Sequence, residues 1–168
     1  MEQELEQAVK LCARSRQAVM EMFNDARMGQ ALQFEQAAAL VEEISESVLR
    51  HPNVLISLAR LKHSNEYTYM HSVAVCALMI ALARKLGLPD DAVREAGLAG
   101  LLHDIGKMAV PQELLDKPGK LTDTEFAKVR KHPEEGGSIL LASKQVSALV
   151  LDVCPVSYTH LRAHETGR

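Results

Sequence analysis

An imidazole and a carboxylate stand next to each other in an otherwise apolar stretch of the chain. The stretch is GLLHDIGK, residues 100–107, and the pair is His103 and Asp104. Burying ionisable groups costs free energy unless they are paired or bind a metal ion. Adjacent positions on a helix diverge by about 100°, so both side chains can avoid the apolar core only if something lies between them. A metal ion meets that requirement.

Two more histidines from other parts of the chain strengthen this interpretation. His71 begins the most apolar segment, and His132 stands before a proline that interrupts a helical pattern. A lone histidine on an apolar helix is more often a hydrogen-bonded core residue than a ligand, but three imidazoles and a carboxylate from three elements favour a metal site. This donor set suits zinc, iron or manganese, and the two oxygens of Asp104 could bridge two such ions in a hydrolase.

Lys107 follows the pair at a spacing that places it on the same face of a helix. Its ammonium group could hold a hydroxide or a phosphate oxygen near the metal. The alternative is an ordinary solvated surface lysine.

The composition describes one soluble globular domain. The 168 residues are 47% hydrophobic and 24% charged, as is usual for such a domain. A net charge of −3 gives no reason to expect sequence-independent binding to DNA, RNA or an anionic membrane. Three widely separated cysteines fit a reduced cytoplasmic location. The longest apolar stretch, residues 73–83, is too short to span a bilayer, and no signal peptide precedes it.

The fold is predicted to be all-α, because aromatic residues are only 4% of a chain without tryptophan and Ala, Leu, Val and Met favour helices. The hydrophobic patterns predict helices over 2–28, 34–50, 71–86, 90–107, 122–130, 133–142 and 144–153, with a short apolar segment at 54–61. Asp90 or Asp91 is expected to cap the fourth helix and Thr122 with Glu125 the fifth. The expected inward residues are Ala38, Leu40, Val41, Ile44 and Val48, followed by Val93, Gly97, Leu98, Leu101, Leu102 and Ile105.

The first predicted helix has apolar or small residues at alternating spacings of three and four. This seam consists of Leu5, Ala8, Cys12, Ser15, Val19, Met22 and Ala26. The interpretation we favour is an amphipathic helix docked on its own domain, and the alternative is a connector that forms a homodimer. Gly29 is expected to end the helix. The predicted division of the chain is a connector helix at 1–29, a domain at 30–154 and a tail at 155–168.

Four elements together carry a resemblance to a known family. His71, GLLHDIGK, the loop PQELLDKPGKLTDTE and KHPEEGGSILL resemble, in order and spacing, the first half of an HD-GYP domain over about residues 30–154. The resemblance implies a helical bundle that holds divalent metal ions, iron or manganese, and hydrolyses cyclic di-GMP to linear pGpG or GMP. By position, His71, His103, Asp104 and His132 resemble metal ligands. Asp104 and Lys107 resemble catalytic residues.

Two departures from the family pattern shape the expectation. Tyr67 stands where some members with three metals have a glutamate, so a site with two divalent ions is expected. After VLDVC the family's His-His pair, aspartate and glycine-tyrosine-proline loop do not occur. We therefore expect that this chain is truncated before that motif and that it is weakly active or inactive. The alternatives are another HD phosphohydrolase acting on nucleotides, or a non-enzymatic HD-type signalling scaffold.

The last residues resemble something other than a protein family. VSYTHLRAHET, residues 156–166, resembles a translated transposon-end sequencing adapter, so 155–168 is expected to be a non-native tail. His160, His164 and Glu165 imitate a zinc-binding helix motif and are excluded from the predicted site.

Removing residues 156–168 should leave stability nearly unchanged, because the tail lacks a continuous apolar face to contribute to the core. Thermal unfolding followed by circular dichroism should give the same Tm, within about 1 °C, for the whole and shortened chains. A Tm several degrees lower without the tail would contradict the adapter interpretation.

Overall fold

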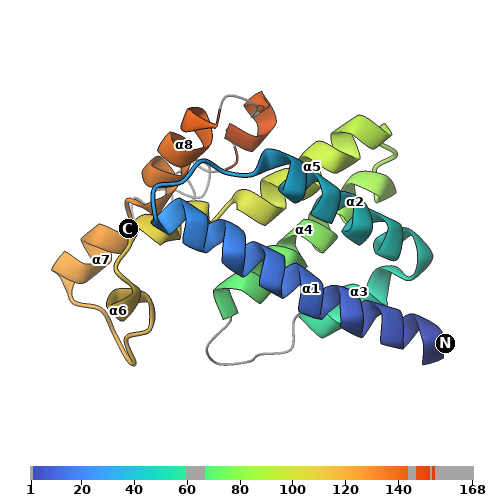
Figure 1. The fold of residues 1–168 in the computed structure, drawn as a ribbon, viewed down its shortest axis with the longest axis horizontal. Coiled ribbons are helices and arrows are strands. Elements are labelled where there is room, and N and C mark those ends of the chain that lie inside the picture. Colours follow the sequence, from blue (N-terminus) through green and yellow to red (C-terminus); the bar gives the residue numbers. More distant parts are fainter. Residues whose placement is uncertain (1, 60–66, 144–146, 152, 154–168) are drawn as a thin grey trace, which may run out of the picture.

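The regular structure of the described residues is entirely helical (Figure 1). The computed structural model describes residues 2–59, 67–143, 147–151 and 153. The elements are α1 Glu2–Arg27, α2 Phe34–Arg50, α3 Pro52–Ala59, α4 Tyr67–Lys85, α5 Asp90–Leu102, the 3-10 helix η1 Ile105–Ala109, α6 Gln112–Leu115, α7 Asp123–Val129 and α8 His132–Ala142. Residues 148–151 and 153, inside the last predicted helix, are also helical. The all-α prediction is confirmed.

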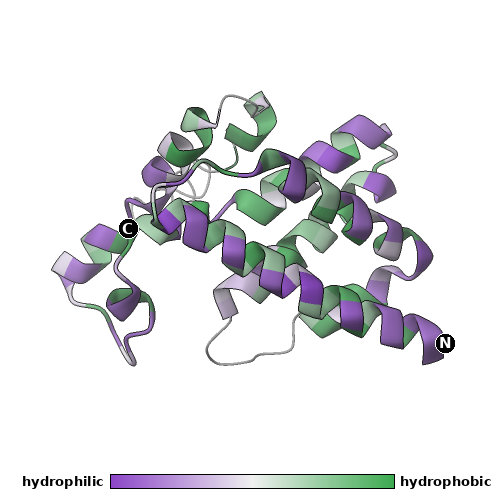
Figure 2. Ribbon diagram, in the orientation of Figure 1, coloured by the Kyte–Doolittle hydropathy of each residue, from purple (hydrophilic) through white to green (hydrophobic). Residues whose placement is uncertain are grey.

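Helix α4 forms the centre of the core, as its apolar sequence predicts. It packs against α1, α2, α3 and α5, and Val73, Cys76, Ala77 and Ile80 have no exposed surface. It begins a turn before the predicted start at His71. Among the described helices, α4 alone is long and apolar enough to span a membrane by length and composition, a property that core helices share. Figure 2 shows hydrophobic colouring over much of α4 and over the later part of α5, its main neighbour, whereas the first turn of α5 is hydrophilic.

Helix α1 docks on the rest of the domain, along a broader face than the predicted seam. Its buried residues are Ala8, Leu11, Ser15, Val19, Met22 and Phe23, whereas Leu5 is 50% exposed. The addition of Leu11 and Phe23 widens the stripe to the width typical of a helix packed on a globular core. This face contacts α3, α4 and η1. Gly29 follows with a φ of +74°, the left-handed conformation expected after a helix end.

Several local predictions hold and others need correction. The capping box is confirmed, since the Glu125 amide donates to Thr122 Oγ1 at 3.2 Å and the Thr122 amide to Glu125 Oε2 at 2.8 Å. In α2, Ala38 is exposed and Ala37 is buried in its place. Helix α5 is preceded by Pro89 without a side-chain cap, so the predicted caps Asp90 and Asp91 instead lie in the first turn, where carboxylates favour the helix dipole.

The prediction of one helix through GLLHDIGK is wrong. Helix α5 ends at Leu102, Asp104 has φ −105° and ψ 10°, and the chain resumes as η1. A continuous helix would point the side chains of His103 and Asp104 about 100° apart. The break lets both side chains face one point. Gly106 allows η1 to lie directly against α8 after this break. A Cβ at Gly106 would lie 2.5 Å from the Gly136 amide nitrogen and 2.7 Å from the His132 carbonyl carbon.

Replacing Gly106 with Ala should force η1 away from the start of α8. Overpacking of this kind costs about 1–3 kcal/mol of unfolding free energy, which lowers Tm by about 2–10 °C. Gly137→Ala is the matched control, because among the described residues no atom beyond its chain neighbours and the backbone of α8 lies within 4 Å of a Cβ built there, and alanine is the better helix former. Equal Tm values for the two variants in a thermal melt would contradict the close backbone contact.

Candidate metal centre

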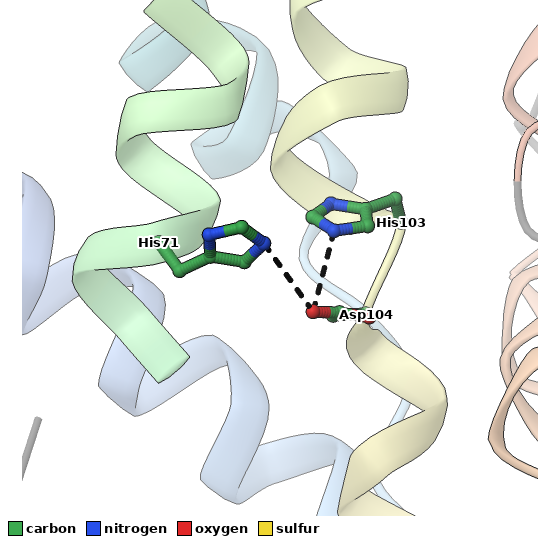
Figure 3. Close-up of side chains that lie close together, drawn as sticks. All are labelled: His71, His103 and Asp104. Carbon is green, nitrogen blue, oxygen red and sulfur yellow. Dashed lines mark ion pairs between the residues drawn. The ribbon is translucent and has the colours of Figure 1, made fainter. Parts of the chain in front are cut away.

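His71 and His103 converge on a single oxygen of Asp104, although His71 lies on α4 and His103 directly follows α5 (Figure 3). His103 Nε2 lies 3.2 Å from Asp104 Oδ2, and His71 Nε2 lies 3.9 Å from the same oxygen. One donor atom from each of the three residues lies within 4.8 Å of the others. The arrangement thus gathers two imidazole nitrogens and a carboxylate oxygen around one small volume.

His132 approaches the other oxygen of the same carboxylate. Its Nε2 lies 3.5 Å from Asp104 Oδ1, and it stands at the first residue of α8. The four residues predicted as ligands from the sequence therefore meet in space. His71 and His103 face Oδ2, and His132 faces Oδ1.

Two of the imidazole rings are oriented by backbone carbonyls of the preceding turn. His103 Nδ1 lies 2.7 Å from the Gly100 oxygen and His132 Nδ1 lies 2.8 Å from the Val129 oxygen. A carbonyl oxygen only accepts, so each Nδ1 carries the hydrogen and each Nε2 faces Asp104. Histidines that ligate metals usually donate their second ring N–H in this way.

Two glycines, Gly100 and Gly106, let the elements of the site come close together, a role that the predicted helices do not include. A Cβ at Gly100 would lie 3.0 Å from the Val75 oxygen and 3.1 Å from the Cys76 nitrogen, so α5 meets the backbone of α4 about one turn after His71. Gly106 does the same between η1 and α8. The signal available in the sequence was a small residue inside an apolar helical run, which often marks close backbone approach.

The electrostatics of the site keep Asp104 ionised. Burial alone would raise the pKa of this carboxyl, but hydrogen bonds from His103 and His132, together with the charges of His103 and Lys107, hold the pKa well below its usual range. Lys107 Nζ lies 2.7 Å from Asp104 Oδ2. The carboxyl group is therefore ionised at neutral pH.

The pKa values of the two histidines beside Oδ2 shift in opposite directions. Burial lowers the pKa of His71, and the neighbouring His103 and Lys107 lower it further against the opposing effect of Asp104. Burial also acts to lower the pKa of His103, but its hydrogen bond and charge interaction with Asp104 outweigh burial and raise it. At neutral pH His71 therefore presents a free nitrogen lone pair.

Tyr67 lies beside the site, one turn before His71 on α4. The two rings stack with centroids 5.7 Å apart and planes 15° from parallel. Tyr67 thus covers one face of the imidazole and supplies no carboxylate. The tail residues His160, His164 and Glu165 lie outside the described residues, as does His63 in the turn predicted before α4.

These donors fit a divalent transition metal. Imidazole nitrogens and a carboxylate oxygen are the ligands that zinc, iron and manganese prefer. The carboxylate is buried and ionised, and two of the imidazoles have their second nitrogen fixed by a carbonyl. Which ions bind, and how many, stays a prediction.

The chain is similar to proteins named as phosphodiesterases of cyclic dinucleotides. It matches the HD domain family over residues 53–165. It is 65% identical over 167 residues to a cyclic di-GMP phosphodiesterase of Pseudomonas aeruginosa. It is 37% identical over 99 residues to a 3'3'-cGAMP-specific phosphodiesterase of Vibrio cholerae and 36% over 104 residues to a cyclic di-GMP phosphodiesterase response regulator of Xanthomonas campestris. No solved structure matches the chain significantly.

The alignments cover different shares of the proteins compared. They include 99%, 59% and 56% of this chain, but 40%, 21% and 27% of the Pseudomonas, Vibrio and Xanthomonas proteins. The chain thus spans less than half the length of these relatives. Because the family match covers more than half of the chain and includes His71, the HDIGK motif and His132, the chain belongs to the HD domain family, and its relatives support the HD-GYP branch of that family.

Proposed function

We propose that this chain supplies the metal-binding part of a phosphodiesterase that hydrolyses cyclic di-GMP to linear pGpG or GMP. The observation that carries the proposal is the convergence of His71, His103 and His132 on the carboxylate of Asp104. The names of the relatives support the reaction and the cyclic dinucleotide as substrate class. The relative matched along nearly the whole chain favours cyclic di-GMP.

Two divalent ions, iron or manganese, suit the site better than one. Asp104 presents Oδ2 to His71 and His103 and Oδ1 to His132. A carboxylate whose oxygens face separate imidazoles can bridge two ions. When bound, such ions lower the pKa of a coordinated water and stabilise charge on a phosphoryl oxygen.

The protein's own groups prepare the site for an anionic substrate. Asp104 stays ionised, and the Nδ1 hydrogen bonds of His103 and His132 hold their Nε2 atoms toward it. Lys107 is in contact with Asp104 Oδ2 at 2.7 Å while its side chain remains 25% exposed. Its ammonium group can therefore reach a phosphate oxygen from the edge of the site, where a fixed positive charge favours the transition state.

The 168-residue chain should bind manganese or iron through these residues. Purified without chelator, it should carry fewer than two ions per chain, because the family's later motifs do not occur in this sequence. His103→Ala should remove most of the metal measured by elemental analysis. The matched control is His51→Ala, which alters a histidine at the junction of α2 and α3. If the metal content of His103→Ala equals that of the unchanged chain, the ligands lie elsewhere.

Hydrolysis should require residues beyond those present in this sequence. The chain alone should convert cyclic di-GMP slowly or not at all, and a chimera joined after Cys154 to the remaining C-terminal part of the Pseudomonas relative should be active. In the chimera, Asp104→Asn should abolish turnover, and Lys107→Ala should lower it about 10 to 1000-fold, the order expected for one electrostatic contact. Product chromatography with manganese or ferrous iron supplied measures both rates.

The same assay separates the alternatives. Lys10→Ala, which removes a surface lysine paired with Glu6, should leave the chimera's rate unchanged. A metal-loaded chimera that cleaves other nucleotides but not cyclic di-GMP would indicate a different HD phosphohydrolase. A metal-loaded chimera that cleaves none would favour the signalling scaffold.

A further inference from the structure

Arg27, in the last turn of α1, holds the segment that follows the HDIGK motif. One guanidinium nitrogen lies 2.7 Å from Gln112 Oε1 and 3.6 Å from Met108 Sδ, and the other lies 3.4 Å from the Val110 carbonyl oxygen. These three contacts fall within five consecutive residues. The guanidinium group, with its fixed fork of donors, is suited to joining several acceptors at once.

The segment that Arg27 contacts begins with the short 3-10 helix η1. Two hydrogen bonds at its ends run from Lys107 N to Asp104 O at 2.9 Å and from Val110 N to Lys107 O at 3.0 Å. Such 3-10 bonds have poorer geometry than those of an α-helix. On one side, η1 is in contact with the backbone of α8 at Gly106. Arg27 provides support from α1.

The same end of α1 also contacts the helix that carries His71. Phe23, one turn before Arg27 and fully buried, meets Tyr69 edge to face with ring centroids 5.9 Å apart. Tyr69 lies two residues before His71 on α4. Positions i and i+4 share one face of a helix, so a single face of α1 reaches both α4 and η1.

We infer that Arg27 is a positioning residue for the metal centre, which it acts on by fixing η1 and thereby Asp104 and Lys107. The inference rests on the metal site proposed above. Without Arg27, the Val110 carbonyl and Gln112 Oε1 lose the guanidinium donor and η1 gains freedom. The spacing of Asp104 from His71 then varies, and the ligands must be ordered when the ion binds.

The test measures manganese binding and backbone exchange on the 168-residue chain. Arg27→Ala should weaken Mn²⁺ binding in titration calorimetry several-fold, less than the roughly 10 to 100-fold loss expected for a group that hydrogen-bonds a ligand directly. It should also speed amide hydrogen exchange in residues 105–110 and leave exchange in α2 unchanged. Arg27→Lys should restore part of the Mn²⁺ affinity and part of the protection from exchange, since an ammonium group can reach one acceptor but not three.

Matched variants guard against a merely structural effect. Arg14→Ala removes an arginine of the same helix that pairs with Glu43 at 2.7 Å and is 68% exposed, and it should change neither measurement. Gln112→Ala leaves α1 intact and removes the 2.7 Å acceptor, so it should reproduce a smaller part of the effect even if the Arg27 variants fold poorly.

The outcomes distinguish this inference from the proposed function. Wild-type Mn²⁺ affinity in Arg27→Ala, or faster exchange spread evenly over the chain, would overturn the positioning role. If His103→Ala also leaves Mn²⁺ binding unchanged, the metal site itself is wrong. The exchange measurement does not require metal binding. Unchanged amide exchange in residues 105–110 of Arg27→Ala would therefore overturn the positioning role even if the metal site is wrong.

Discussion

A carboxylate buried as deeply as that of Asp104, which is only 5% exposed, must be compensated by cations, hydrogen-bond donors or a metal ion. The compensation comes from three directions: His71 on α4, His103 and Lys107 on either side in the sequence, and His132 on α8. Removing any of these elements would leave a buried charge with fewer partners. The packing of α4, α5, η1 and α8 is therefore tied to the chemistry of one side chain.

The distances within the site depend on close contacts between backbones. Gly100 lets α5 meet the α4 backbone at Val75 and Cys76, and Gly106 lets η1 meet the start of α8. Side chains at these glycines would push His71 and His132 away from Asp104. Because protein interiors are close-packed, such a displacement would spread to neighbouring elements.

The parts of this structure that depend on local sequence could be predicted, and those that depend on contacts between distant residues could not. The capping box of Thr122 and Glu125 and the helix end at Gly29 follow from neighbouring residues, and the motifs name the residues that the structure brings together at Asp104. The break at His103 and Asp104 was missed, because the apolar pattern continues through Ile105 and only the contact with α8 reveals the change. The burial of Ala37 in place of Ala38 likewise reflects the packing of α2 rather than its own pattern.

In the site, local contacts set the orientation of the histidine rings, and contacts between distant elements set the distances between them. His103 and His132 each take their orientation from a carbonyl three residues earlier, so each ring is set within its own turn. Their distances from His71 depend on how α4, α5, η1 and α8 pack, and α1 contacts both α4 and η1. A small shift of α1 would therefore change the spacing of the donors while leaving the orientation of those two rings intact. Metal affinity depends on both the orientation and the spacing of donors, so in the proposed site a change at the end of α1 would act without altering any residue that converges on Asp104.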